Sequence, residues 1–148
     1  MSSVAKPIIK QIEDNQDALD FFETVLLPAE DEKTQNIIMN FPTVYIHNWW
    51  QSGDFEIYVG ESNDIFRRTR QHYDAASDKL KWQNKLLQKD ARLFIIGHEH
   101  FNKSLTLDIE NRLMHYMMSV ECVKHVYNLR DNPQTSYYLS LIHISEPT

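Results

Sequence analysis

Apolar and polar positions alternate along the chain with two different periods, which predicts a mixture of helices and strands. Residues 11–27, QIEDNQDALDFFETVLL, place apolar side chains at roughly helical spacing, and Pro28 ends the predicted helix. Residues 43–50, TVYIHNWW, are β-branched and aromatic, which favours a strand. The turn sequence QSGD and the alternating FEIYVG follow, so residues 43–60 are expected to form a β-hairpin.

The second half of the chain continues the alternation. Ser62 or Asn63 is expected to cap a helix over residues 64–75, and a second, basic helix is expected over residues 78–90. The run ARLFIIG predicts a third strand. A helix capped by Thr106 or Asp108 follows, and then the β- or loop-like stretch KHVYNLRDNP. This order predicts an α+β fold with a small three-stranded antiparallel or mixed sheet flanked by helices.

The length of 148 residues fits one domain with an appended element. We expect an N-terminal helical extension over residues 1–42 and the main domain over residues 43–138. The last ten residues, 139–148, read LSLIHISEPT. They match, ten for ten, the translation of a transposase sequencing adapter. We therefore exclude this tail from fold reasoning and expect the natural protein to continue beyond Tyr138.

Composition narrows the class of protein. The single cysteine, Cys122, excludes an internal disulfide framework and fits a reducing compartment. The sequence has neither an apolar run long enough to span a membrane nor the layout of a secretory signal. A cytoplasmic protein without a membrane partner is the resulting expectation.

Charge is distributed unevenly around a net value of −6. Residues 1–42 hold three lysines against eight acidic residues, whereas residues 67–92 hold eight basic residues against three acidic ones. A concentrated basic segment can attract phosphates even on an acidic protein. The alternative is a solvated helical face with no partner.

The stretch IYVGESNDIFRRTRQHY, residues 57–73, gathers groups that bind phosphate. Arg68 and His72 are four residues apart in a predicted helix, so they share a face about 6 Å apart along its axis. Arginine is a bidentate phosphate partner, and histidine can relay a proton. Tyr58 ends the preceding strand, and Gly60 permits a tight turn from strand to helix.

At these residues the chain resembles the GIY-YIG nucleases, over residues 43 to about 134. The first motif is represented by TVY in place of the family's GIY, and the second by YVG. An arginine, a histidine, a helical glutamate and an asparagine follow at the family's spacing. The matched positions are Tyr45, Tyr58, Gly60, Arg68, His72, Glu110 and Asn128.

The resemblance implies a metal-dependent endonuclease acting on nucleic acid, with DNA as the expected substrate. Glu110 would hold one Mg²⁺ or Mn²⁺ ion, and Arg68 would stabilise developing negative charge. Tyr45 is the first candidate for the general base and Tyr58 the second, with His72 bonded to the base or to a phosphate oxygen. The closest likeness is to versions fused to the N-terminus of helicase-like, ATP-dependent proteins, so a C-terminal ATPase region is expected.

The helical pattern around Glu110 supports this role. The residues three, four and seven positions later, Leu113, Met114 and Met117, are apolar, so Glu110 lies on or beside the buried stripe, where a carboxylate needs a partner. A hard cation would satisfy it. The alternatives are stabilisation by the helix dipole or pairing with a neighbouring arginine.

Several other residues admit two interpretations. Arg67, Arg70, Lys81 and Lys85 are candidate nonspecific contacts to nucleic acid or simply solvated charges. Glu61 is a rival metal ligand, Asn128 is a structural cap or a near-site residue, and Trp82 stacks on a base or fills the core. Two further functions stay open: a catalytically silent nucleic-acid-binding module, and a protein-interaction domain that docks through the acidic N-terminal helix.

Overall fold

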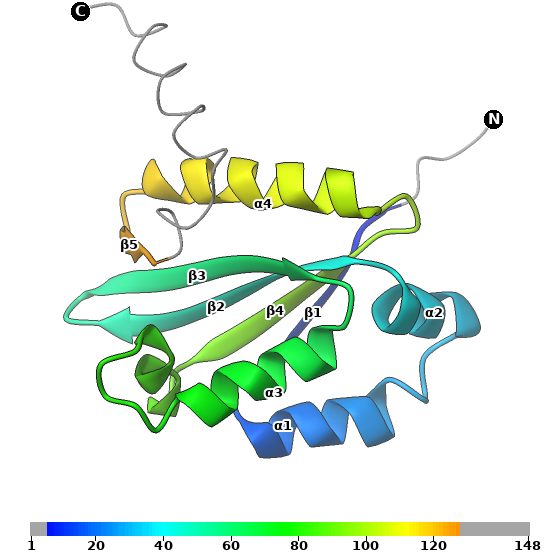
Figure 1. Ribbon diagram of the computed structural model, residues 1–148, viewed down its shortest axis with the longest axis horizontal. Helices are drawn as coiled ribbons and strands as arrows, with labels where there is room; N and C mark the ends of the chain where they lie inside the picture. Colours follow the sequence, from blue (N-terminus) through cyan, green and yellow to red (C-terminus); the bar gives the residue numbers. More distant parts are fainter. Residues whose placement is uncertain (1–5, 128–148) are drawn as a thin grey trace, which may run out of the picture.

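A mixed five-stranded sheet with helices on both faces forms the framework of the protein (Figure 1). The computed structural model describes residues 6–127. The predicted α+β class is confirmed, but the predicted sheet of three strands is wrong, because two further strands pair with its edges. Among the described residues, no helix is long and apolar enough to cross a membrane.

The strands lie in the order β1-β4-β2-β3-β5. The predicted hairpin is present as β2 (Thr43–Gln51) and β3 (Asp54–Ser62), and the predicted third strand is β4 (Arg92–Gly97), antiparallel to β2. A two-residue turn joins the hairpin, with φ of 53° at Ser52 and 97° at Gly53. The parallel strand β5 (Val123–Val126) adds to β3.

The first strand, β1 (Ile8–Glu13), overturns the expectation of a helix over residues 11–27. Its side chains alternate between half-buried and exposed, and it pairs antiparallel with β4 along its whole length. The helix begins only after Asn15, whose side-chain oxygen accepts a hydrogen bond from the backbone N–H of Ala18 at 2.8 Å. Helix α1 (Gln16–Phe21) then passes into a π-helical turn, Phe22–Leu26. Residues 8–13 therefore belong to the main sheet.

Of the remaining α-helices, two were predicted with different starting points and one was not predicted. Helix α2 (Glu32–Asn40) was not predicted, α3 (Ile65–Ala75) begins after Asp64, and α4 (Lys103–Met118) begins after Asn102. The predicted basic helix over residues 78–90 is wrong. Only a six-residue 3-10 helix, η2 (Trp82–Leu87), forms there.

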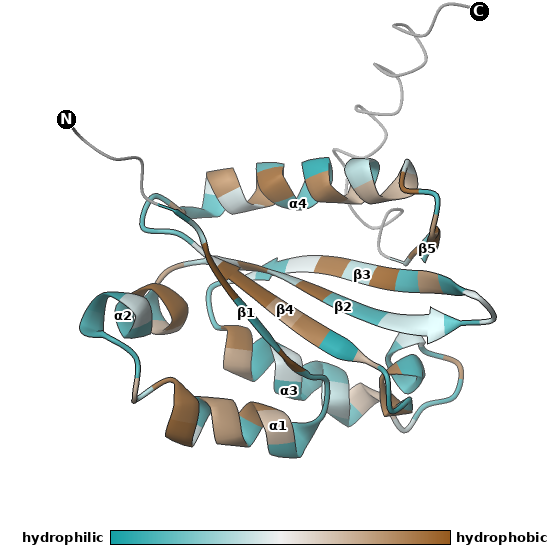
Figure 2. Ribbon diagram, turned by 180° about the vertical axis from the view of Figure 1, so that it is seen from behind, coloured by the Kyte–Doolittle hydropathy of each residue, from teal (hydrophilic) through white to brown (hydrophobic). Residues whose placement is uncertain are grey.

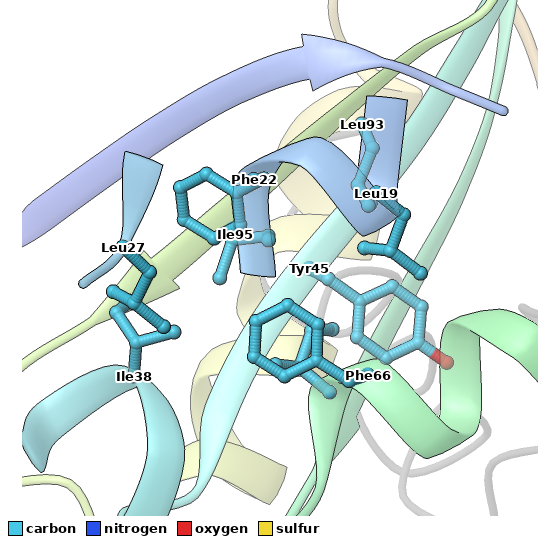
Figure 3. Close-up of a cluster of buried hydrophobic side chains, with 9 residues drawn as sticks. Leu19, Phe22, Leu27, Ile38, Tyr45, Phe66, Leu93 and Ile95 are labelled. Carbon is cyan, nitrogen blue, oxygen red and sulfur yellow. The ribbon is translucent and has the colours of Figure 1, made fainter. Parts of the chain in front are cut away.

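Buried apolar clusters lie on both faces of the sheet. Helices α1 and α3 cover one face, and α4 covers the other (Figure 1). In Figure 2 apolar and polar segments alternate along α4, as expected for a helix with one face against a sheet. Val44 and Ile46 point into the α4 core, whereas Tyr45 between them points into the core under α3 (Figure 3).

Candidate active site

Gly60 makes room for the ring of Tyr45. The two residues face each other across the β2–β3 pair, and a Cβ added at Gly60 would lie 2.3 Å from Cζ of Tyr45. Real Cβ atoms essentially never come so close to another heavy atom. The expected tight turn at Gly60 is wrong, because the residue lies within β3. The tyrosine-x-glycine pattern has a packing reason instead, since only a glycine lets the phenol lie across β3.

The Tyr45 hydroxyl is held inside the protein by His72. The Oη of Tyr45 lies 3.0 Å from Nε2 of His72, and the two residues are 1% and 2% exposed. Figure 3 shows the hydroxyl at the edge of the apolar cluster, directed toward α3. Burial raises the pKa of Tyr45 well above its usual value, and hydrogen bonding and charge from Arg68 oppose that rise.

His72 is buried in a neutral state. Burial lowers its pKa to about 2, and the nearby His47 and Arg68 push the pKa in the same direction. Its second ring nitrogen, Nδ1, lies 3.2 Å from Nε2 of Gln83 in η2. Both nitrogens of the ring therefore have partners, from a strand on one side and from a turn on the other.

Tyr58 is the less buried of the two phenols. Its ring stacks on Trp82, with centroids 4.0 Å apart and planes inclined by 12°. Burial raises the pKa of Tyr58, while the charge and hydrogen bonding of Arg68 lower it. Arg68 is exposed to solvent. Its guanidinium nevertheless influences the pKa of both phenols.

Glu110 approaches the phenols from the other layer. It lies on α4, is only 9% exposed, and its charge contributes to raising the pKa of Tyr45 and of Tyr58. In the described part of the chain, β5 pairs only with residues 55–57 of β3, so the edge of β3 around Gly60 has no strand paired to it. The carboxylate thus acts electrostatically on hydroxyls that project from the opposite face of the sheet.

Glu61 anchors α4 beside this stretch. Its carboxylate accepts hydrogen bonds from Nζ of Lys103 at 2.5 Å and from Oγ1 of Thr106 at 3.0 Å. Thr106 precedes Glu110 by one helical turn, so both residues lie on the same face of α4. Glu61 therefore has two partners already and fixes the position of the helix that carries Glu110.

A shallow hollow of about 300 Å³ opens where β3 ends and α3 begins. It is lined by cations and by acidic and polar side chains: Arg67, Arg68, Lys103, Glu61, Asp64, Ser62, Asn63 and Gln71. Arg67 is exposed, and the three cations of this hollow come from two different helices. The hollow can accept a phosphate next to Arg68.

Among residues 6–127, no group of three or more His, Cys, Asp or Glu side chains is placed to hold a metal ion. A site for Mg²⁺ or Mn²⁺ needs only one protein carboxylate when water and substrate phosphate supply the other oxygens. Among the predicted site residues, Glu110 is a buried carboxylate whose charge acts on both phenols.

The other predicted contacts have different surroundings. Arg70 forms ion pairs with Asp20 at 2.8 Å and Glu23 at 2.6 Å, so its charge is balanced within the protein. Lys81 is exposed and Lys85 is half-buried. Their role in binding nucleic acid stays a prediction. Asn128 lies outside the described residues.

Sequence reasoning missed the polar network beneath the site. Asp14 accepts hydrogen bonds from Tyr73 at 2.6 Å and from Nδ1 of His47, and the side chains of Asp14 and His47 are fully buried. Gln83 was not identified either. The available signal was the alternation along β2, since Tyr45, His47 and the buried Trp49 point to the same face.

Comparisons with known proteins found no matching family model, curated protein or solved structure.

Proposed function

We propose that this domain is a metal-dependent endonuclease that hydrolyses phosphodiester bonds in DNA, as the N-terminal module of a larger, helicase-like protein. One observation carries the proposal. Tyr45 and Tyr58 from adjacent strands, and Arg68 and His72 from one face of α3, meet at a spot where the charge of Glu110 also acts. The resemblance to GIY-YIG nucleases supports the same residues independently of this geometry.

The two phenols differ in solvent exposure, which suits them to different roles. Tyr45 is nearly inaccessible, whereas Tyr58 is partly exposed. We therefore assign the role of general base to Tyr58 and regard Tyr45 as its buried hydrogen-bonding partner. Water gives its proton to the Tyr58 phenolate, and the resulting hydroxide attacks phosphorus. The bond from phosphorus to the leaving oxygen breaks, and the leaving oxygen takes a proton from solvent.

Arg68 stabilises the charge that develops during this attack. Its exposed guanidinium borders the hollow, so it can bind non-bridging phosphoryl oxygens while it lowers the pKa of the adjacent base. Mg²⁺ or Mn²⁺, when bound through Glu110, supplies Lewis-acid stabilisation of the leaving oxygen. His72, neutral and buried, holds Tyr45 in position.

The test is cleavage of supercoiled plasmid by the full chain in the presence of Mg²⁺ or Mn²⁺. Arg68→Ala and Glu110→Gln are expected to reduce the cleavage rate by roughly a hundredfold or more, because each removes charge stabilisation in the transition state. Arg112→Ala and Glu121→Gln are matched controls, since both residues are exposed and neither lines the hollow. Cleavage that persists in both site variants would show that the site is wrongly assigned.

A second candidate is a catalytically silent module that binds nucleic acid. The position of α4 on the face opposite Tyr45 favours it, because Glu110 must act from the other layer of the fold. This function predicts DNA binding that weakens steeply with salt and falls on Arg67→Ala or Lys81→Ala, with no cleavage under any divalent metal.

A further inference from the structure

A chain of hydrogen bonds runs from Gln83 through His72 to Tyr45. Nε2 of Gln83 lies 3.2 Å from Nδ1 of His72, and Nε2 of His72 lies 3.0 Å from Oη of Tyr45. His72 and Tyr45 are almost completely shielded from solvent. Bulk water therefore does not compete for these groups, and each hydrogen must lie between two protein atoms.

The chemistry of the amide gives this chain a direction. A side-chain amide nitrogen only donates, so Nδ1 of His72 accepts the hydrogen bond from Gln83. Because burial keeps the imidazole neutral, its one hydrogen must lie on Nε2, which then donates to Oη of Tyr45. The Tyr45 hydroxyl hydrogen is left to point elsewhere. Hydrogen bonding with Tyr45 is among the influences that lower the pKa of Tyr58, against the larger effect of burial.

The turn that carries Gln83 is held on both sides. Trp82 stacks face to face on Tyr58, and Nδ2 of Asn84 donates to the backbone oxygen of Ala76 at 2.7 Å. The amide of Gln83 is thus presented to His72 from a fixed backbone. The 3-10 helix η2 therefore lies beside the site, within the segment 78–90 that was predicted as a basic helix.

We propose that Gln83 is a positioning residue that holds His72 in the tautomer with hydrogen on Nε2, so that His72 donates to Tyr45 and the Tyr45 hydroxyl is left to donate to the Tyr58 phenolate. The tautomer follows from contacts alone, whereas the consequence for Tyr58 rests on the proposed nuclease function. The other charged or titratable groups around the chain are Arg68 of α3, Glu110 of α4 and the buried pair His47–Asp14.

Three substitutions separate donor from acceptor at this position. Gln83→Lys only donates, Gln83→Glu only accepts when ionised, and Gln83→Met does neither at similar length. In ¹⁵N NMR spectra, the shift of each ring nitrogen reports whether that nitrogen carries hydrogen. The His72 signals are assigned by their loss in His72→Gln, since the chain has seven histidines.

We expect hydrogen on Nε2 in the wild type and in Gln83→Lys, hydrogen on Nδ1 in Gln83→Glu, and a mixture in Gln83→Met. Circular dichroism melts confirm that each variant is folded. If Gln83→Glu unfolds, the comparison of Gln83→Met with Gln83→Lys still tests the tautomer. If His72 keeps one tautomer in all folded variants, the proposal is overturned.

The activity measurement tests the second step. The pH–rate profile of plasmid cleavage in Gln83→Glu is expected to shift to higher pH, with a rate at neutral pH roughly tenfold lower. The reason is that the hydrogen bond between His72 and Tyr45 reverses its direction, so the Tyr45 hydroxyl no longer stabilises the Tyr58 phenolate. Gln83→Lys keeps a donor at this position, so it should shift the profile less than Gln83→Glu does. Unchanged profiles, with the tautomer shifted as expected, would refute the positioning role. Absence of cleavage by the wild type would refute the proposed function, while the NMR result still decides the tautomer.

Discussion

Replacement of Gly60 by alanine tests the packing of the site more directly than any catalytic substitution. The added Cβ would lie 2.3 Å from Cζ, 2.4 Å from Oη and 2.8 Å from Cε1 of Tyr45, so the ring has to move. Overpacking of this kind costs about 1–3 kcal/mol. If the ring moves, the buried bond to His72 is broken, which adds about 1–3 kcal/mol. We expect Gly60→Ala to lower the free energy of unfolding by about 2–5 kcal/mol, with the terms not fully additive.

The assay is equilibrium unfolding in urea, combined with a double-mutant cycle. Tyr45→Leu shortens the side chain that meets the new Cβ, so Gly60→Ala should cost much less in that background. Gly53→Ala is the control, because Gly53 has a positive φ of 97° and no atom within 4 Å of its added Cβ. Its cost of about 1–2 kcal/mol comes from the backbone and should be the same in both backgrounds.

Two results would contradict this reasoning. A change below about 0.5 kcal/mol in Gly60→Ala would mean that the Tyr45 ring yields without loss. An equal cost of Gly60→Ala in the wild-type and Tyr45→Leu backgrounds would mean that the penalty does not arise from the contact with the ring.

Three further predictions concern buried and exposed charges. Burial lowers the pKa of His72 from 6.5 to about 2, so between these pH values the unfolded state binds more protons than the folded state. The free energy of unfolding should therefore fall as the pH drops below about 6.5, by at most about 1.4 kcal/mol per pH unit. Urea unfolding of His72→Gln at several pH values should lack this component. Asp14→Ala leaves the buried His47 without its carboxylate and should cost about 3–5 kcal/mol by urea unfolding. Arg70→Ala breaks half-exposed ion pairs, so it should change stability by about 0–1 kcal/mol and weaken DNA binding less than Arg67→Ala in a salt titration of fluorescence anisotropy.

Local patterns predicted the central hairpin and strand β4 because their signals are contained in short windows. The alternation of FEIYVG and the turn with Gly53 need no distant partner to be recognised. Helix α3 was also predicted, because Arg68 and His72 lie within one continuous helical segment. Its capping residue is Asp64, however, and not the predicted Ser62 or Asn63. These elements position four of the five proposed catalytic residues.

The wrong predictions occur where distant contacts decide the local structure. The segment IIKQIE has both alternating and helical character, and its pairing with β4, 79 to 89 residues away, selects the strand. In residues 78–90, the run of lysines suggested a helical face. The stacking of Trp82 on Tyr58 instead fixes a short 3-10 turn against the sheet. Both outcomes depend on contacts that no window of the sequence contains.

The buried polar side chains of β2 connect the candidate site to the rest of the fold. Tyr45 bonds to His72 of α3, His47 bonds to Asp14 at the end of β1, and Trp49 donates to Glu56 of β3 at 2.9 Å. A buried polar group that loses its partner is costly, so each of these bonds restricts the sheet to one arrangement of its neighbours. Because Asp14 comes from the segment first interpreted as a helical extension, that segment stabilises the same face that carries the two phenols. The N-terminal strand and the proposed catalytic centre are therefore parts of one cooperative structure.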